Sequence, residues 1–390
     1  MKILIASDSY IQINGVSNSV SLLVHGLREK GHEVKVLTLS PDRKSYKEGD
    51  DYFISSVDAL VYPDMRISVA LYDELIDELV SWKPDIAHIQ TEFSAKFLAA
   101  RVVRKCGIPF VMTSHTDYEE YFKSKKIPPV FARNAIKNFE RIIYSKADAL
   151  IVPSYKIQEL MEIYKVKCPV VVIPTGIELS NHPSLRDGRE ALMKKVGLQN
   201  NGKVLVTVSR ISKEKNIDEL IGFMPALLRE DPEITLLVVG GGPYLEKLKE
   251  KADALGVADS VIFTDMVPSE EVYKYYRLGD IFVSASTFET QGLTYVEALA
   301  NELPLVCRED KALINIIDPG KNGFIYTDET EFIAHIMTIL GDRDLQKRMS
   351  RASVIKSFAF SKEVFVSAVE ELYEDVIAGY DGAEFPLEEE

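Results

Sequence analysis

Short apolar runs alternate with helical patterns along the first half of the chain. Lys2–Ser7 is an apolar run, and the helical stretch after it places Val20, Leu23 and Leu27 on one face. The next strand candidates are Glu33–Leu39, Asp85–Gln90, Phe110–Ser114 and Ala149–Pro153, of which the last three are each followed by a helical pattern. Strands that are continuously apolar, with helices between them, predict a parallel sheet covered on both faces.

The same pattern pauses and then begins again. The pause is Ile173–Glu178 with the polar run to Asp187, and we place a linker at 174–188. Five strand candidates follow, Val204–Ser209, Thr235–Gly240, Val261–Thr264, Ile281–Ala285 and Leu305–Cys307. The chain of 390 residues is therefore expected to form two α/β domains, 1–178 and 179–361, followed by a C-terminal helix and an acidic tail over 362–390.

This layout predicts where a ligand binds and which face the last helix buries. Open parallel sheets bind ligands outside the carboxyl ends of their strands, so a cleft between the two domains is the expected site. The helical pattern Lys362–Ala378 has one apolar stripe, made of Val364, Phe365, Ala368, Leu372 and Val376.

Composition narrows the class of protein. Hydrophobic residues make up 46% of the chain and charged residues 27%, as in soluble globular proteins. The three cysteines form no CxxC pair, which argues against a disulfide framework or a zinc ribbon and favours a reducing cytosol. The N-terminal segment does not have the pattern of a signal peptide, and no run approaches ~18 apolar residues, so no transmembrane helix is expected. A net charge of -14 argues against a general nucleic-acid binder.

Two glycine-containing loops follow predicted strands. Gly15 lies between the first strand and a helix, where close backbone approach and the helix N-terminus favour an anion, although a simple turn would have the same pattern. Gly240–Pro243 resembles a dinucleotide fingerprint, but Pro243 interrupts the spacing. We interpret the second loop as a tight turn before a helix, which disfavours a nicotinamide enzyme.

Two cations follow the strand Val204–Ser209. Arg210 offers a fork of donors for phosphate oxygens, and Lys215 adds a compact second charge. Their position at a strand end suits a diphosphate. The alternative is that both are solvated surface charges.

Two glutamates, Glu289 and Glu297, lie eight positions apart on either side of a predicted helix start near Gly292. The backbone amides between them would form an anion cradle, and the carboxylates could accept hydrogen bonds from hydroxyl groups. This pattern suits a sugar nucleotide, although a capping glutamate and a surface glutamate would look the same.

One histidine and one acidic triplet complete the candidates. His115 follows the strand Phe110–Ser114 and is placed to donate to a reacting group, although a lone histidine is more often structural. Asp342–Asp344 is the only D-x-D triplet, and we assign it to the surface. No obligatory metal is expected, although the site is compatible with Mg²⁺.

Together these segments resemble the retaining glycosyltransferases of family four, which have the GT-B fold. That fold consists of two Rossmann-like parallel-sheet domains that face a central cleft, with a C-terminal helix that can cross back to the N-terminal domain. Within the family, the chain is most similar to the 1,2-diacylglycerol 3-α-glucosyltransferases. The segments that carry this similarity are His115–Glu119, Val152–Ser154, Ile173–Glu178, Ser209–Asn216 and Glu289–Thr294. Where relatives have a glycine before the next strand, this chain has Asn301, which we expect to end the helix in the left-handed conformation.

The resemblance implies a role for each candidate. Arg210 and Lys215 would hold the donor diphosphate and stabilise the charge on the leaving UDP, while the Gly15 loop would close on the phosphate and the sugar. Glu297 would hold the ribose, and His115 would contact the sugar near the reacting carbon. Glu289 and the residues after it would hold hydroxyls of the donor sugar; these residues are Thr290, Gln291, Gly292, Leu293 and Thr294. Met266 and Val267 would lie near the uracil.

A basic amphipathic segment suggests contact with a membrane. Residues 101–146 carry ten Lys and Arg against four Asp and Glu, and Pro129–Ala147 can be drawn as a helix. Its apolar side has Phe131, Ala135, Ile136, Phe139, Ile142 and Ile143. Its basic side has Arg133, Lys137 and Arg141, and Lys123, Lys125 and Lys126 precede it. Such a segment can lie against anionic lipid, or its apolar side can simply pack on the first sheet.

The charge distribution points to the same side of the protein. Residues 1–182 carry 23 Lys and Arg and 23 Asp and Glu, whereas residues 183–390 carry 23 and 37. We therefore expect a neutral N-terminal domain to face an anionic bilayer beside a C-terminal domain of charge -14.

These observations lead to one main functional hypothesis with several alternatives. The chain is expected to transfer glucose from UDP-glucose to the 3-hydroxyl of diacylglycerol at the cytoplasmic face of the membrane, with retention of configuration and no obligatory cofactor. Alternatives of the same fold use UDP-galactose, or act on glucosyl-diacylglycerol, a soluble sugar or a polysaccharide. A UDP-sugar 2-epimerase is disfavoured by the pair Arg210 and Lys215 together with Glu289 and Glu297. A non-catalytic sugar-nucleotide-binding protein is a further alternative.

Overall fold

The computed structural model describes residues 1–10, 15–58, 66–68, 72–118, 129–179, 189–198 and 202–381. These residues divide into two compact units. Unit 1 is Met1–Glu178 with Lys362–Glu390, and unit 2 is Leu179–Ser361. Part of the linker region that we placed at 174–188, namely 180–188, lies outside the described residues, as does the acidic tail from residue 382.

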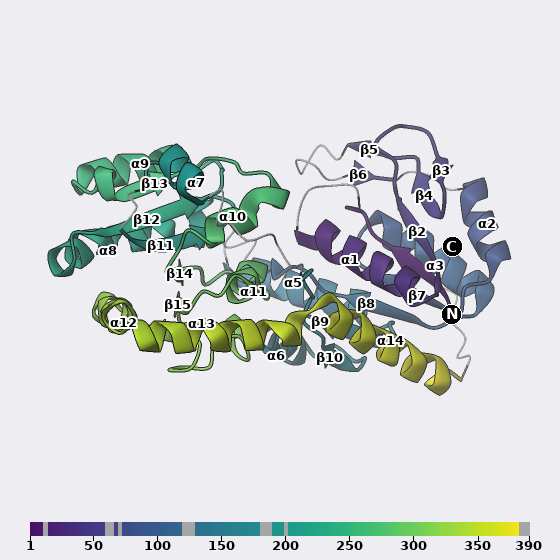
Figure 1. Cartoon of the computed structure of the whole chain (residues 1–390). Helices are drawn as coiled ribbons and strands as arrows, with labels where there is room; N and C mark the ends of the chain where they lie inside the picture. Colours follow the sequence, from purple (N-terminus) through teal and green to yellow (C-terminus); the bar gives the residue numbers. More distant parts are fainter. Residues whose placement is uncertain are drawn as a thin grey trace. The chain divides into compact units, whose positions relative to one another are not determined.

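Unit 1 is built on a sheet of eight strands in the order β10-β9-β8-β7-β1-β2-β4-β3 (Figure 1). All neighbouring strands are parallel except β3 and β4. The strands are β1 (Lys2–Ala6), β2 (Glu33–Leu39), β3 (Tyr46–Glu48), β4 (Asp51–Ile54), β7 (Ile86–Ile89), β8 (Phe110–Thr113), β9 (Ala149–Val152) and β10 (Val170–Val172). A separate antiparallel ribbon pairs β5 (Val57–Asp58) with β6 (Arg66–Ile67).

The helices of unit 1 cover this sheet, and two core clusters lie against it. The helices are α1 (Gly15–Glu29), α2 (Glu74–Trp82), α3 (Ser94–Cys106), α5 (Pro129–Tyr144), α6 (Tyr155–Tyr164) and α14 (Lys362–Gly379). Alternate residues of a strand belong to different clusters: Leu4 packs in the cluster of α2 and α3, whereas Ile3 and Ile5 pack in the cluster of α1 and α14. Because both faces are covered, the strands are apolar throughout, as the sequence pattern predicts.

Unit 2 has a sheet of six parallel strands in the order β13-β12-β11-β14-β15-β16. The strands are β11 (Lys203–Val208), β12 (Ile234–Val239), β13 (Val261–Phe263), β14 (Ile281–Ser284), β15 (Leu305–Arg308) and β16 (Gly323–Tyr326). The α-helices are α7 (Arg189–Val196), α8 (Ile217–Glu230), α9 (Leu245–Ala254), α10 (Val272–Tyr276), α11 (Leu293–Ala300), α12 (Glu329–Gly341) and α13 (Arg343–Ser357). Short 3-10 turns are η2 (Lys213–Lys215), η3 (Ala258–Ser260), η4 (Ser269–Glu271), η5 (Lys311–Leu313) and η6 (Phe358–Phe360). The predicted pair of parallel α/β sheets is thus confirmed.

Helix α14 follows unit 2 in the sequence and packs in unit 1 against α1. Its buried face is Phe365, Val366, Val369 and Tyr373. Val364, which the apolar pattern placed on the buried stripe, is 49% exposed, so that part of the prediction was wrong. The face is rotated because Gly26 of α1 lets Val366 approach: a Cβ added at Gly26 would lie 2.4 Å from Val366 Cγ2.

The membership of α14 also overturns the predicted charge asymmetry. Unit 1, with residues 362–390, has 24 Lys and Arg against 33 Asp and Glu, a net charge of -9. Unit 2 has 22 against 27, a net charge of -5. The excess of carboxylates therefore lies mainly in the C-terminal segment of unit 1, and a neutral first domain beside a strongly acidic second one was wrong.

The close packing of Gly26 on Val366 makes the first prediction. Gly26→Ala should lower the melting temperature of unit 1 by several degrees, because overpacking a helix contact costs about 1–3 kcal/mol, more than alanine gains in helix propensity. Differential scanning calorimetry measures the change. The double variant Gly26→Ala with Val366→Ala should recover most of the loss, and a melting temperature raised by Gly26→Ala alone would show that Val366 moves aside.

Candidate active site

Lys215 and Glu289 meet at the carboxyl edge of the sheet of unit 2. Lys215 ends η2 after β11, and Glu289 lies in the loop after β14, the strand next to β11. The Lys215 Nζ atom lies 2.6 Å from Glu289 Oε1, and the two side chains are only 21% and 14% exposed. Neighbouring parallel strands end at the same edge, which is how residues 74 positions apart form one ion pair. A partly buried cation and carboxylate side by side can bind a phosphate and a hydroxyl of one ligand.

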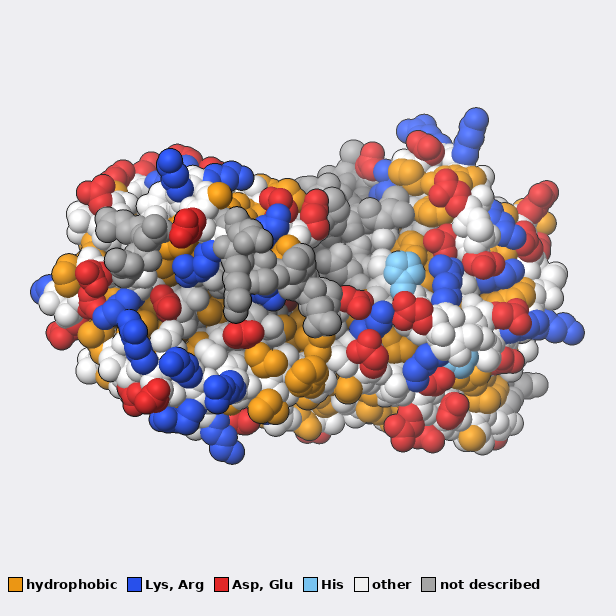
Figure 2. Space-filling model, in the orientation of Figure 1, with side chains coloured by type: hydrophobic (Ala, Val, Ile, Leu, Met, Phe, Trp, Pro, Cys, Tyr) orange, Lys and Arg blue, Asp and Glu red, His pale blue; other side chains and the backbone are white. Residues whose placement is uncertain are grey.

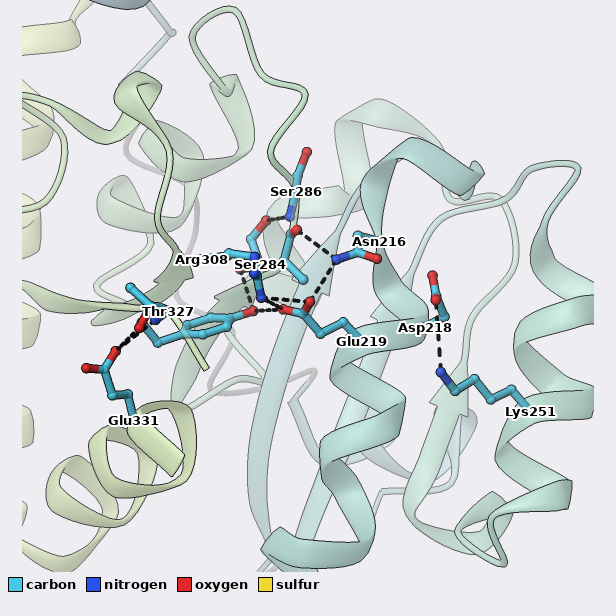
Figure 3. A network of polar contacts seen from close by, with 11 residues as sticks. Asn216, Asp218, Glu219, Lys251, Ser284, Ser286, Arg308, Thr327 and Glu331 are labelled. Carbon is cyan, nitrogen blue, oxygen red and sulfur yellow. Dashed lines mark hydrogen bonds and ion pairs between the residues drawn. The ribbon is translucent and has the colours of Figure 1, made fainter. Parts of the chain in front are cut away.

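The carboxylate of Glu219 joins several elements at the same edge of the sheet (Figure 3). Glu219, in the first turn of α8, accepts hydrogen bonds from Arg308 Nη1 at 2.9 and 2.8 Å, from Tyr326 Oη at 3.0 Å and from Asn216 Nδ2 at 3.0 Å. Arg308 ends β15 and Tyr326 ends β16, so one carboxylate connects two strand ends with the residue after Lys215.

Asn216 carries the connection to the loop of Glu289. It has left-handed backbone geometry, with φ 53°, and its Nδ2 atom also lies 3.4 Å from the carbonyl oxygen of Ala285. From there Ser284 Oγ accepts from the Ser286 amide (Figure 3). Ser286 Oγ in turn accepts from the Phe288 amide, which orders the turn before Glu289. Sequence reasoning missed Glu219 and Arg308. The N-x-x-E spacing of Asn216 and Glu219 at a helix start was the available signal.

The second glutamate has a different partner. Glu297, on α11, is half-buried and its Oε2 accepts from Tyr276 Oη at 2.7 Å. Burial raises the pKa of Glu297, and the Tyr276 hydrogen bond opposes that rise. Gly292 caps the start of α11 with φ 78°, and a Cβ there would lie 2.4 Å from the Tyr295 ring, so this position requires glycine.

The remaining residues of the segment lie between the two glutamates, at the start of α11. Gln291 is buried, and Thr290, Leu293 and Thr294 are half-buried. The end of α11 differs from the expectation. Asn301 has φ -96°, and it is Glu302, with φ 67°, that takes the left-handed conformation.

Arg210 is exposed and lies on a loop that packs against the glycine turn. Within the described residues its side chain forms no hydrogen bond or ion pair. An added Cβ at Gly240 would lie 2.0 Å from Ser209 O, and one at Gly242 would lie 2.2 Å from Ile211 O. The glycines thus allow the turn to touch the backbone on both sides of Arg210, which is a packing role rather than a nucleotide fingerprint.

Met266 and Val267 lie beside the same turn. The Met266 amide nitrogen is 3.2 Å from where a Cβ of Gly241 would be, and the Met266 side chain is 78% exposed. Val267 is half-buried. An exposed apolar side chain near the Arg210 loop is compatible with a flat aromatic base.

His115 lies at the carboxyl edge of the sheet of unit 1. It follows β8, and its Nε2 atom is 2.7 Å from Gln90 Oε1. An amide oxygen only accepts, so Nε2 carries the proton and Nδ1 has the free lone pair. Burial lowers the pKa of His115 to about 4, so the ring is neutral at pH 7. The geometry makes Nδ1 a hydrogen-bond acceptor, whereas the sequence had suggested a donor.

A buried network positions Gln90. Its Nε2 atom lies 3.3 Å from His88 Nδ1, and the same Nδ1 atom is hydrogen-bonded to the hydroxyl of Tyr373 at 2.5 Å. His88 Nε2 lies 2.6 Å from Thr113 Oγ1, and burial lowers the pKa of His88 to about 3. Tyr373 belongs to α14, so the C-terminal helix supports the histidine at the sheet edge. Sequence reasoning missed this network, although polar residues inside an apolar strand were a visible signal.

Gly15 is the first residue of α1 and is exposed, while residues 11–14 of its loop lie outside the described residues. Asp342 of the D-x-D triplet is exposed and caps α13, accepting from the amides of Asp344 and Leu345. In the described part of the chain, no group of three or more His, Cys, Asp or Glu is placed to hold a metal ion.

Helix α5 divides the apolar side that the sequence predicted. Ile136 and Ile143 are buried in unit 1, whereas Phe139 is 38% exposed and Ile142 is 63% exposed. On the basic side Arg133 is exposed, while Lys137 and Arg141 are partly buried. Lys123, Lys125 and Lys126 lie outside the described residues, and the side chain of Phe131 is not described. Among the described helices, none combines the length and apolar character needed to cross a bilayer.

Two family patterns match the chain, one in each half. Glycosyltransferase Family 4 matches residues 13–181, and Glycosyl transferases group 1 matches residues 188–354. The alpha-monoglucosyldiacylglycerol synthase of Streptococcus pneumoniae is 34% identical over 97% of this chain and 86% of that protein. A protein of the same name from Acholeplasma laidlawii is 33% identical over 97% of this chain and 98% of that protein. The chain belongs to glycosyltransferase family 4.

Solved structures show that this family 4 glycosyltransferase has the GT-B type of fold. Sucrose-phosphate synthase from Thermosynechococcus elongatus matches with a TM-score of 0.76 at 19% identity, over 97% of this chain and all of that one. Anabaena HepE, solved in complex with UDP and glucose, matches with a TM-score of 0.74 at 18% identity, over 96% of this chain and 100% of that one. The family resemblance and the fold class inferred from the motifs are confirmed, and the protein is a hexosyltransferase.

The contact between Gln90 and His115 makes the second prediction for this glycosyltransferase. Gln90→Glu places a carboxylate beside Nε2–H, which favours the charged ring and should raise the pKa of His115 from about 4 by roughly 1–3 units. His88, in the same network, is a titratable group that interacts electrostatically with His115. If neutral His115 is needed, activity in the variant should be lost as pH falls through about 5–7 rather than about 4.

Histidine NMR titration and the pH profile of turnover measure these two effects separately. Gln90→Met, which has no charge, is the control and should leave the pKa of His115 low. If the pKa of His115 rises in Gln90→Glu but the pH at which activity is lost does not change, the protonation state of His115 does not matter for the reaction.

Proposed function

We propose that this enzyme transfers glucose from UDP-glucose to the 3-hydroxyl of 1,2-diacylglycerol at the cytoplasmic membrane surface, with retention of configuration, and so makes α-monoglucosyldiacylglycerol. The observation that carries the proposal is the match to two alpha-monoglucosyldiacylglycerol synthases over 97% of this chain. The Lys215–Glu289 pair supports it, because a diphosphate and sugar hydroxyls need a cation and a carboxylate side by side.

The donor would bind to the carboxyl edge of unit 2. Arg210 is unpaired within the described residues and would contact the diphosphate together with Lys215. An ammonium group has three donors, so Lys215 can keep its bond to Glu289 while it binds a phosphate oxygen. Glu289 would in turn accept from hydroxyls of the glucose, next to the amides at the start of α11. Glu297 would accept from the ribose in addition to Tyr276, and Met266 with Val267 would lie against the uracil.

The transfer itself breaks one bond and forms one. The bond from the anomeric carbon to the β-phosphate oxygen breaks, and UDP leaves with the electron pair. The acceptor hydroxyl oxygen bonds to the anomeric carbon on the same face, and its proton passes to the departing phosphate oxygen. Arg210 and Lys215 stabilise the negative charge that develops on UDP, which is the largest contribution these residues can make. The Gly15 loop would close on the phosphate and the sugar, and His115 would accept from a sugar hydroxyl through Nδ1.

A product assay tests the substrate assignment. The enzyme is given UDP-glucose or UDP-galactose with vesicles that contain diacylglycerol, glucosyl-diacylglycerol or neither, and the products are identified by mass and anomeric configuration. We expect one α-linked hexose on diacylglycerol, with UDP-glucose preferred. Isomerised UDP-sugar without transfer would instead identify an epimerase. Transfer only to glucosyl-diacylglycerol or to a soluble sugar would show that diacylglycerol is not the acceptor.

The role of Arg210 makes a separate prediction. Arg210→Ala should lower turnover by ~10²–10³-fold, the usual loss when one charge-stabilising donor is removed from a transferase site. Arg229→Ala is the matched control, because Arg229 is an exposed arginine at the far end of α8. Normal turnover in Arg210→Ala would refute its place at the diphosphate.

The basic side of α5, with Arg133, Lys137 and Arg141, is proposed to contact anionic lipid together with Lys123, Lys125 and Lys126, which precede the helix in the sequence. The exposed side chains of Phe139 and Ile142 support this orientation of the helix towards a bilayer. Lys137→Glu with Arg141→Glu should reduce activity on anionic vesicles several-fold more than activity on acceptor in detergent, most clearly at low salt. Equal losses in both assays would point to a folding defect and not to a membrane contact.

A further inference from the structure

Helix α13 of unit 2 presents an exposed basic face. Lys347 and Arg351 are one turn apart on the same side, with Arg348 beside them, and all three are exposed. The opposite side, Met349, Ser353 and Ser357, is buried in unit 2. The exposed residues and the buried residues each recur every four positions, so the helix has one packed face and one face that is open in the described structure.

The same open face ends in exposed apolar side chains. Ile355 follows Arg351 by one turn and is 71% exposed, and Phe358, at the start of η6, is 59% exposed. Both are large hydrophobic residues for which unit 2 offers no packing partner sufficient to bury them. Cations followed by exposed apolar residues along one helix is a pattern typical of segments that lie in the membrane interface.

The charge around this face is one-sided. Residues 345–361 contain four Lys and Arg and no Asp or Glu, although unit 2 as a whole has net charge -5. One of the four, Lys356, forms an ion pair with Asp318. Within the described residues, Lys347 and Arg351 form no ion pair. Figure 2 shows Lys and Arg side chains gathered over the position of α13. Exposed cations without an ion-pair partner attract an anionic partner locally even though the net charge of the unit opposes it.

We propose that this face of α13 is a membrane contact in unit 2, separate from α5. Lys347, Arg348 and Arg351 bind the headgroups of anionic lipids, and Ile355 and Phe358 enter the boundary between headgroups and acyl chains. The proposal rests on the proposed function, since an acceptor in the bilayer gives the enzyme a reason to bind there. A bilayer fits better than an acidic protein because two strongly exposed apolar side chains, Ile355 and Phe358, accompany the cations, and charge attraction to an acidic protein alone would leave these side chains in water.

Vesicle flotation of the full-length protein tests the basic part. Lys347→Glu with Arg351→Glu should weaken partitioning onto vesicles rich in phosphatidylglycerol by roughly 30-fold or more at low salt, because each cation at the surface contributes about fivefold and the two effects multiply. The matched control is Lys194→Glu with Lys195→Glu on α7, which makes the same change of charge at two other exposed lysines of unit 2 and should bind like the wild type. Equal binding of both variants and the wild type would overturn the proposal.

A second variant tests the apolar part. Ile355→Ser with Phe358→Ser should keep binding at low salt but lose most of the binding that survives at high salt, where charge attraction is screened. Both side chains are exposed, so the variant should melt at the wild-type temperature. Undiminished salt-resistant binding by this variant would refute insertion of the two residues. If the variant binds like the wild type and soluble polyglutamate displaces the wild type from vesicles, the face would be assigned to an acidic protein instead.

The readout is binding and not turnover, so it separates this proposal from the proposed function. If the enzyme fails the product assay but binds vesicles through α13, the membrane contact stands and the proposed acceptor is wrong. If the enzyme glucosylates diacylglycerol but the α13 variants bind vesicles normally, the proposed function stands and the contact through α13 is refuted.

Discussion

One partly buried carboxylate organises the carboxyl edge of unit 2. Glu219 accepts from donors that belong to β15, β16 and the residue after η2, and its side chain is only 19% exposed. Removing a carboxylate from water is costly unless donors surround it, so these three elements have to take a common arrangement. The loops that carry Lys215 and Glu289 are fixed by that arrangement. The polar groups that we propose for the sugar nucleotide are therefore oriented before a ligand binds, which would reduce the reorganisation needed to reach the transition state.

In unit 1, burial keeps two titratable side chains neutral, whereas in unit 2 a carboxylate is buried among hydrogen-bond donors. His88 and His115 are kept neutral by the loss of solvent, with pKa values of about 3 and about 4. A neutral imidazole has one donor and one acceptor nitrogen, so the network fixes which nitrogen of His115 is free. Tyr373 completes this network from α14, which also packs on Gly26. The C-terminal helix thus acts on unit 1 both through apolar packing and through the position of a histidine proton.

The relation of the enzyme to lipid surfaces follows from local and not from total charge. Both units are net negative, which would repel an anionic bilayer at long range. Exposed side chains on α5 and α13 combine cations with apolar residues, and interactions at an interface act within about a Debye length, ~8–10 Å at moderate salt. An enzyme of family 4 with a bilayer acceptor, as we propose, would therefore depend on a few surface residues for its docking and on buried ones for its chemistry.

Much of this protein was determined by its sequence alone. Continuous apolar strands between helices predicted two covered parallel sheets, and the motifs around Arg210, Lys215, Glu289 and Glu297 predicted the family, because strand periodicity and local loop chemistry are properties of short segments. Which groups meet was decided only by tertiary structure. The pair Lys215–Glu289, the contacts of Glu219 with Arg308, and the network from Tyr373 to His115 join residues 74, 89 and more than 200 positions apart. Such contacts depend on strand order and on which unit a helix packs against. The same reason explains why the charge of the first domain was misjudged, since no local pattern shows that residues 362–379 pack on α1, and only the family resemblance allowed for a C-terminal helix that crosses back.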